Sequence, residues 1–314
     1  MTARIGFVVI GRNEEKHLGR CLAAVVAEAA DGPVLYVDSQ STDRSLAIAK
    51  AFPSVQTHVL ADSAPSAAKA RNAGWRALTD IEHVHFVDGD TELVPGWVER
   101  ARTALADPGV GAVYGRFRER HPEASIYNRM ADLDWPSTPG EVATFGGIVL
   151  VRRACLVETG GFDEDLRTGE DPALALEIRR RGFRILQLDA LMAWHDIDLH
   201  TFSAYWRRNV LSGWSMAEVA FRAKGQQPFW RSRTLRLGVL LILFFGAVAL
   251  GILVDARLLL AVPLLVAADL LRIALHNRGR VGRFAHAFAY ALHARGMVVP
   301  LTLGHLRWWR ERAR

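Results

Sequence analysis

The residues of this chain with the clearest capacity for chemistry are carboxylates that follow apolar runs. The mostly apolar run 84–87 leads directly into Asp88, Gly89 and Asp90. Two carboxylates separated by one residue offer hard oxygen ligands, which suit Mg²⁺ or Mn²⁺ holding a diphosphate. Gly89 would let a ligand come close to the backbone. The alternative is a strand that ends in a polar turn.

A second acid, Asp38, ends the apolar run 34–37 in the same way. Continuous apolar runs indicate strands buried on both faces, and open α/β sheets bind ligands at the carboxyl ends of such strands. We therefore expect Asp38 and Asp88 at one rim, with Asp38 accepting hydrogen bonds from ribose hydroxyls or a base N–H; the alternative is a turn or a helix cap. Arg71, early on a predicted helix, either reaches a phosphate or base or faces solvent.

Glu170 and Asp171 form a second candidate centre. Pro172 follows them and suits the first turn of a helix that runs through Arg181. The two acids would then lie at or beside a helix N-terminus. A carboxylate at the mouth of a pocket is suited to accept a proton as a general base, and the alternative is helix capping alone.

These acids must be positioned by strands and helices that alternate along the chain. Apolar runs predict strands over 5–10, 33–38, 56–60, 84–87, 148–151 and 185–188. Helical spacing predicts helices over 16–30, 43–52, 66–78, 172–181 and 202–222. Such alternation favours a doubly wound, mostly parallel α/β sheet. The segment 114–141 is expected to be irregular, as an acceptor-side excursion or a structural loop.

Several stretches, in order and spacing, resemble the family 2 glycosyltransferases over roughly residues 4–215: VVIGRNEE, LYVDSQSTDRS, AAKARNAG, HFVDGDTEL, FGGIVLVRR and GGFDEDLRTGEDPALALEIRRRGF. The resemblance implies a nucleotide-binding, GT-A-like fold and inverting transfer from a UDP- or GDP-linked sugar with a divalent metal, Mg²⁺ or Mn²⁺. Two departures stand out. The first loop, GRNEE, lacks a proline and one residue that many members have, and VDSQSTD stands where VDDGSTD is usual, so Ser39 replaces an acid and Gln40 a glycine.

The resemblance also implies roles for individual residues. The base is Asp171, with Glu170 beside it, and the metal ligands are Asp90 and His195. The donor-binding residues are Gly11, Asn13, Glu14, Asp38, Ser39, Arg71 and Asp88. The diphosphate or acceptor side comprises Gly146, Gly147, Trp194, Arg207 and Arg208.

Some of these residues have plain alternatives. A lone histidine such as His195 is more often structural than a ligand, and the paired glycines Gly146 and Gly147 can simply make a bend. Arg207 and Arg208 would also suit an amphipathic helix lying on a bilayer.

The C-terminal part, 229–314, predicts a membrane region after a cytosolic catalytic domain over 1–228. Residues 237–254 are eighteen residues without a charge, and a helix of that length spans about 27 Å, close to the roughly 30 Å hydrocarbon core. We expect spans over about 236–254 and 257–275, a turn at 255–257, and an interfacial or re-entrant helix over about 284–306. The alternative is a buried hairpin.

Charge and composition also favour a membrane region. The net charge is +6, and only four of the 39 basic residues are lysines. Because many arginines flank the apolar C-terminal segments, we expect a membrane partner and no nucleic acid. The positive-inside rule then predicts a multi-pass protein of the inner (plasma) membrane with a cytoplasmic catalytic domain. The two cysteines, Cys21 and Cys155, give no disulfide framework, and no signal-peptide layout is present.

The resulting hypothesis is a membrane-anchored transferase whose acceptor is a polyprenyl-linked saccharide, a glycolipid or a growing exopolysaccharide. The chain lacks the QxxRW pattern of processive synthases, which weakens a processive mode. Two other functions stay open: a non-catalytic nucleotide-binding scaffold of a polysaccharide assembly, and a sugar-phosphate nucleotidyltransferase. The absence of a glycine-rich, lysine-bearing N-terminal loop counts against the latter.

Overall fold

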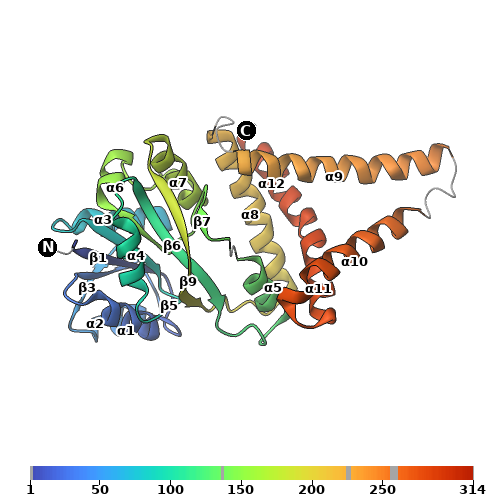
Figure 1. Cartoon of the computed structure of the whole chain (residues 1–314). Helices are drawn as coiled ribbons and strands as arrows, with labels where there is room; N and C mark the ends of the chain where they lie inside the picture. Colours follow the sequence, from blue (N-terminus) through green and yellow to red (C-terminus); the bar gives the residue numbers. More distant parts are fainter. Residues whose placement is uncertain (1–2, 136–137, 224–227, 255–260, 314) are drawn as a thin grey trace. The chain divides into compact units, whose positions relative to one another are not determined.

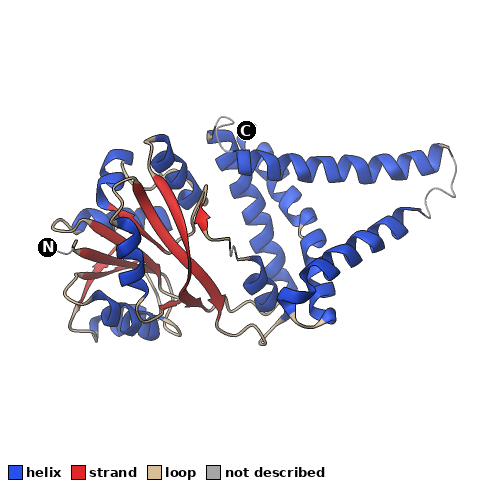
Figure 2. Cartoon of the chain, in the orientation of Figure 1, coloured by secondary structure: helices blue, strands red, loops and turns tan. Residues whose placement is uncertain are grey.

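The computed structural model describes residues 3–135, 138–223, 228–254 and 261–313. It divides into two compact units, Met1–Asp198 and Leu199–Arg314, which are described separately here. The first unit is an α/β unit and the second is helical (Figures 1 and 2). The functional boundary predicted at residue 228 stays a prediction.

The described part of the first unit forms one sheet of nine strands. The strands are β1 Ile5–Gly11, β2 Val34–Asp38, β3 Val55–Val59, β4 His83–Asp88, β5 Thr91–Leu93, β6 Val110–Glu119, β7 Gly140–Glu141, β8 Val149–Arg152 and β9 Arg184–His195. Their order is β3-β2-β1-β4-β8-β6-β9-β5, and β7 pairs with β9. The helices are α1 Leu18–Ala29, α2 Ser45–Lys50, α3 Ala67–Ala77, α4 Trp97–Leu105, α5 Ile126–Asp134, α6 Arg153–Thr159 and α7 Glu170–Arg180.

The parallel half of the sheet follows from strands that are apolar on both faces. Phe7 lies beside His85 and Val8 beside Phe86 in the β1–β4 register. On one face Phe7 and His85 stack at 5.6 Å, and His85 Nε2 accepts a hydrogen bond from the Trp97 indole of α4 at 2.8 Å. On the other face Val8 packs against Gly74 of α3. Helices on both faces bury the whole strand, which is why its sequence is continuously apolar.

The other half of the sheet corrects the sequence prediction. Strand β8 is antiparallel to both β4 and β6, β5 and β7 are antiparallel to β9, and β6 and β9 are parallel to each other. The sheet is therefore mixed rather than mostly parallel throughout. The described part of the segment 120–148, through which the chain reaches β8, contains the short helix α5 and the two-residue strand β7.

Two further expectations fail in the same region. The segment 114–141 was expected to be irregular, yet most of β6 and all of α5 and β7 lie within it. Strand β9 runs to His195, well beyond the predicted strand over 185–188. Both strands carry polar and charged residues where one face is open, so their apolar pattern is broken.

The second unit contains the helices α8 Phe202–Arg222, α9 Pro228–Leu253, α10 Ala261–Val281, α11 Phe284–Gly296 and α12 Val298–Arg312. Helices α8 and α12 pack closely because Gly213 lies against the Leu301 carbonyl and Gly304 against the Val210 carbonyl, with no room for a side chain at either glycine. Trp308 donates a hydrogen bond from its indole N–H to the buried Glu218.

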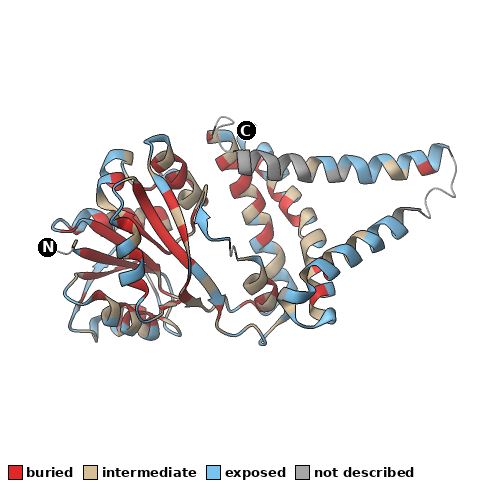
Figure 3. Ribbon diagram, in the orientation of Figure 1, coloured by how far each residue is buried: buried red, intermediate tan, exposed pale blue. Residues whose placement is uncertain are grey.

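Helices α9 and α10 expose many large apolar side chains in their described parts (Figure 3). Within the described residues, no helix is both long enough and apolar enough to cross a membrane. The predicted spans over 236–254 and 257–275 and the helix over 284–306 stay predictions as membrane segments. The predicted turn at 255–257 lies outside the described residues.

Candidate active site

The carboxyl ends of β1, β2 and β4 meet at the rim of a cavity of about 320 Å³. In the strand registers Gly11 lies beside Asp38, and Ile10 lies beside Asp88, so parallel pairing brings these positions together as predicted. The cavity is lined by Ile10, Gly11, Arg12, Glu14, Ser39, Pro65, Ser66, Ala67, Arg71, Asp88, Gly89 and Asp90. Its volume lies within the range of small-molecule sites.

Asp38 lies beneath this rim and does not line the cavity. The residue is 1% exposed. Its carboxylate accepts a hydrogen bond from the Tyr36 hydroxyl at 3.0 Å and another from the Ser41 backbone N–H at 2.9 Å. The structure thus assigns Asp38 the turn-shaping contacts that the sequence left open, and its contact with a nucleoside stays a prediction.

Asn13 joins the first loop to the second. It has a left-handed φ of 60°, a conformation that asparagine adopts more readily than most residues. Its side-chain oxygen accepts a hydrogen bond from the Thr42 backbone N–H at 2.8 Å, and its own N–H donates to the Ser41 hydroxyl at 2.9 Å. Asn13 therefore supports the loop whose neighbours Gly11 and Glu14 line the cavity.

Arg71 connects the two acidic centres. Its guanidinium lies 2.8 Å from Asp88 Oδ1, 2.8 Å from Glu170 Oε1 and 3.4 Å from Asp171 Oδ1, and its side chain is 3% exposed. Phe162 covers it, with the guanidinium carbon 5.4 Å from the ring centre. Arg71 borders the cavity, and its close partners are these acids of the chain itself, so its contact with a phosphate or base stays a prediction.

Gly147 allows the Arg71–Asp88 pair to sit where it does. A Cβ atom at residue 147 would collide with Arg71 Nη2 and Asp88 Oδ2, so a larger residue would displace this pair. Gly146 is different, because nothing lies within 4 Å of the position its Cβ would take. The backbone at Gly147 thus lies close to this ion pair, and the predicted approach of these glycines to a ligand stays a prediction.

Asp171 lies in the first turn of α7, directly after Glu170, and the helix is preceded by Gly169 with a φ of 90°. Burial raises the pKa of Asp171 to about 8, with further increases from the charges of Glu170 and Asp88, while Arg71 opposes the shift. Glu170 uses Oε1 to accept a hydrogen bond from Arg71. The Asp171 carboxylate therefore has a higher affinity for a proton than an ordinary aspartate has.

The two predicted metal ligands lie together. Asp90 Oδ2 and His195 Nε2 are 3.4 Å apart, and Trp135 packs edge-on against the imidazole at 5.3 Å between ring centres. The Nδ1 atom of His195 is buried and has no hydrogen-bond partner in the described part of the chain. Among the described residues, no group of three or more His, Cys, Asp or Glu side chains is arranged to hold a metal.

Negative charge accumulates around Asp90. Burial, followed by the charges of Asp90, Asp88 and Asp43, raises the pKa of Glu14 to about 8. Burial and Asp88 also raise the pKa of Asp90, while His195 lowers it. A bound cation would neutralise part of this negative charge. A carboxylate and an imidazole can both serve as ligands of a divalent metal ion.

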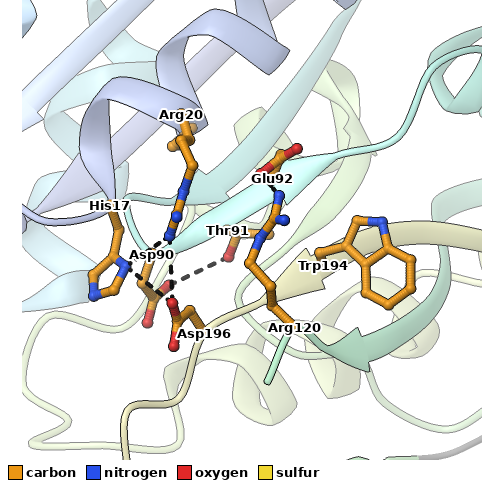
Figure 4. Close-up of a pocket in the computed structure, with 9 residues that line it drawn as sticks. His17, Arg20, Asp90, Thr91, Glu92, Arg120, Trp194 and Asp196 are labelled. Carbon is orange, nitrogen blue, oxygen red and sulfur yellow. Dashed lines mark hydrogen bonds and ion pairs between the residues drawn. The ribbon is translucent and has the colours of Figure 1, made fainter. Parts of the chain in front are cut away.

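Beyond Asp90 lies a small pocket that the sequence did not single out (Figure 4). In it Arg20 and His17 point to Asp196, and Arg120 pairs with Glu92. Trp194, predicted on the acceptor side, lines this pocket. The only sequence signal for Asp196 was its place directly after His195.

Arg207 and Arg208 lie on α8, in the second unit. Their predicted position over the diphosphate or acceptor stays a prediction.

A sequence model of glycosyl transferase family 2 matches residues 7–155. Curated relatives from two strains of Mycobacterium tuberculosis, both named pre-mycofactocin glycosyltransferase, are 28% identical over 142 residues, which is 41% of this chain. The aligned part spans only 30% of the length of those relatives.

Similar solved structures cover almost the whole chain. The mannosyltransferase PcManGT from Pyrobaculum calidifontis, in complex with GDP-Man and Mn²⁺, aligns with a TM-score of 0.63 and 19% identity, covering 93% of this chain and 87% of that one. Residues 1–349 of S. aureus TarS in complex with UDP-GlcNAc align with a TM-score of 0.54 and 18% identity, covering 93% and 92%. At these identities the similarity is one of fold. The matched segment carries the Gly11 loop, Arg71 and the Asp88–Asp90 pair, and over residues 7–155 this chain is similar to glycosyl transferase family 2.

Proposed function

We propose that this protein transfers a sugar from a nucleoside diphosphate sugar to an acceptor hydroxyl with inversion at the anomeric carbon. The observation that carries the proposal is Asp171. Its carboxyl has a pKa raised to about 8, and it lies 3.4 Å from the same Arg71 guanidinium that binds Asp88 at the cavity rim. A base with raised proton affinity is thus linked to the donor cavity through one side chain.

The reaction needs a single displacement. Asp171 takes the proton of the acceptor hydroxyl, and the hydroxyl oxygen forms a bond to the anomeric carbon. The bond from that carbon to the diphosphate oxygen breaks, and the nucleoside diphosphate leaves with the electron pair. Because attack and departure occur on opposite faces, the configuration inverts and no covalent intermediate forms on the chain.

The donor would occupy the 320 Å³ cavity. Gly11, Glu14, Ser39 and Asp88 line it and form its donor-facing wall. Asp90 and His195 would hold a divalent cation, Mg²⁺ or Mn²⁺, since their ligand atoms lie 3.4 Å apart. Bound there, the cation would neutralise charge on the diphosphate leaving group. The base and the sugar remain open, since the similar structures hold GDP-Man in one case and UDP-GlcNAc in another.

We further propose that the acceptor is presented at a membrane, as a polyprenyl-linked saccharide, a glycolipid or a growing exopolysaccharide. The support is the apolar surface of α9 and α10, where Ile242 is 72%, Leu253 83%, Leu264 70% and Leu265 68% exposed. Apolar side chains gathered in this way are a typical surface for a lipid or protein partner. The catalytic unit would then work at the cytoplasmic face of the plasma membrane.

Calorimetry and turnover test the transferase proposal together. The full chain should bind UDP or GDP more tightly with Mn²⁺ than without it, and Asp90→Ala should remove that metal dependence. Asp171→Asn should bind the same nucleotide normally but lose about 10²-fold or more of its activity, measured as nucleoside diphosphate released from a sugar donor.

The outcomes separate the competing functions. Nucleotide binding without turnover in any variant, the unsubstituted chain included, would favour a non-catalytic scaffold. Unchanged turnover in Asp171→Asn would refute the base assignment. Formation of a nucleotide sugar from a sugar phosphate would instead identify a nucleotidyltransferase.

A further inference from the structure

Asp196 is a carboxylate that the proposed chemistry does not use. It follows His195 at the end of β9, and its side chain is only 12% exposed. Its Oδ2 atom lies 3.3 Å from His17 Nδ1 and 3.3 Å from Arg20 Nη2, both at the start of α1 (Figure 4). His121 Nε2 lies 3.9 Å from the same oxygen. Asp196 thus faces a group of basic side chains.

The backbone at this point is tied directly to the predicted metal ligands. The Asp196 N–H donates to the Asp90 carbonyl at 3.2 Å, and the Arg120 N–H donates to the His195 carbonyl at 2.8 Å. The next N–H, that of Ile197, donates to the Glu119 carboxylate at 3.2 Å. The backbone around His195 is therefore hydrogen-bonded both to the Asp90 backbone and to the end of β6.

The partners of Asp196, His17 and Arg20, adjoin the loop that contains Glu14. The Glu14 carbonyl accepts hydrogen bonds from the N–H groups of His17 and Leu18, both at 2.9 Å. The start of α1 is therefore continuous with the loop whose Glu14 side chain lines the donor cavity. Through His17 and Arg20, Asp196 joins the end of β9 to this loop, although the two segments are far apart in the sequence.

We propose that Asp196 is a positioning residue that holds His195 and Asp90 at the separation in which both bind one divalent cation. It does so through its contacts with Arg20 and His17, without touching the cation. The inference rests on the proposed function, because it assumes that this pair binds a metal. Residues that orient metal ligands from behind typically contribute 10–100-fold to metal affinity or activity.

The test is a Mn²⁺ titration of the full chain by calorimetry, in the presence of whichever of UDP and GDP binds. Asp196→Asn keeps the shape of the side chain and removes its charge, so we expect Mn²⁺ to bind about tenfold or more weakly. Arg20→Gln should weaken binding in the same direction by a smaller factor. Nucleoside diphosphate release should recover in both variants as Mn²⁺ is raised to saturation.

Asp198→Asn is the matched control. Asp198 lies two residues farther along the same segment and pairs with Lys16 at 3.4 Å, with both side chains well exposed. This variant loses a similar but well exposed ion pair from the same segment, so its Mn²⁺ affinity should equal that of the unsubstituted chain.

Other results would overturn the proposal. Unchanged Mn²⁺ affinity in a folded Asp196→Asn, checked by urea unfolding, would show that the residue is merely structural. Loss of binding in Asp196→Asn with no effect of Arg20→Gln would make Asp196 a direct ligand. If Asp196→Asn does not fold, the double variant His17→Gln, Arg20→Gln decides the question, because unchanged affinity there overturns the proposal. If the unsubstituted chain binds nucleotide without any metal dependence, the metal part of the proposed function fails, and this inference with it.

Discussion

At the scale of single residues, Arg71 organises the acidic groups of the first unit. A guanidinium presents several N–H donors in a rigid fork, so one side chain can contact Asp88 and Glu170 at 2.8 Å and still lie 3.4 Å from Asp171. The three acids come from β4 and the first turn of α7. No spacing rule links these segments. Sequence reasoning therefore named Arg71 and the three acids but did not predict the contacts between them.

The pKa of Asp171 predicts how the reaction depends on pH. A base acts only when ionised, and the pKa of this carboxyl is raised to about 8 by burial and by neighbouring acids. The specificity constant kcat/KM, which reports the free enzyme, should therefore rise between about pH 6 and about pH 9. Steady-state rates of nucleoside diphosphate release across this range check it. A profile that is flat through pH 8 would contradict the assignment.

Glu14 predicts a pH-dependent stability in the absence of metal. Its folded-state pKa is raised from 4.5 to about 8, so the folded chain holds this proton more tightly than the unfolded chain does. The stability gained from the proton is complete below about pH 4.5 and is lost as the pH rises through 8. Glu14→Gln has no titrating carboxyl, so it should be more stable than the unsubstituted chain at pH 8.5 and not at pH 4.5. The gain should be roughly 1 kcal/mol, well below the full value of the shift, because solvent screens a side chain that is partly exposed.

Urea unfolding at both pH values measures this difference. Glu15→Gln is the control, since the neighbouring Glu15 side chain is 39% exposed and pairs with Arg44. A stability gap for Glu14→Gln that is the same at both pH values would show that the acidic cluster does not set the proton affinity of Glu14.

At the scale of elements, how well a strand is predicted from the sequence depends on how much of it is buried. Strands β1 to β4 were placed within a residue or two, because β1, β2 and β4 are buried along nearly their whole length and therefore read as apolar runs. Helix α8 was predicted with its observed bounds from its apolar spacing. Strand β9 alternates buried residues with partly or fully exposed ones and carries Asp189 in its middle, so only its first part was predicted. The direction of β8 was missed because burial sets which residues are apolar and says nothing about direction.

The candidate site, too, was predicted only in part. Motif positions placed Gly11, Asp88 and Asp90 at one rim, and the registers confirm that neighbourhood. The part that sequence could not give is the set of side-chain contacts between distant segments, of which the Asp196 contacts with α1 are an example.

Helix packing in the second unit predicts a position-specific effect of small substitutions. Gly304 of α12 lies against the Val210 carbonyl of α8 with no room for a Cβ atom. Gly304→Ala should destabilise this pair by about 1–3 kcal/mol through overpacking, even though alanine favours helix by up to about 1 kcal/mol. Gly296→Ala, where nothing lies within 4 Å of the new Cβ, should be neutral or slightly stabilising. Thermal unfolding followed by helical circular dichroism compares the two, and equal midpoints would contradict the packing argument.

At the scale of the whole molecule, the two units differ in how they treat apolar residues. The first unit buries most of its large apolar residues in one core, whereas many of the large apolar residues described in α9 and α10 are exposed. A chain with net charge +6 also has a favourable interaction with anionic surfaces. Charge alone gives binding that salt abolishes, while apolar insertion gives binding that survives salt, so the two contributions can be separated.

Vesicle flotation tests the membrane proposal at this scale. The full chain should float with lipid vesicles at low and at high salt. Replacing Ile242 and Leu265, which are 72% and 68% exposed, with glutamine should reduce the floated fraction severalfold, because each buried apolar side chain contributes about 1.5–3 kcal/mol. Val157→Gln in the first unit removes a side chain that is 56% exposed, and it should leave flotation unchanged. A chain that floats only at low salt, or a Val157 variant as impaired as the double variant, would mean that α9 and α10 are not the membrane-binding surface.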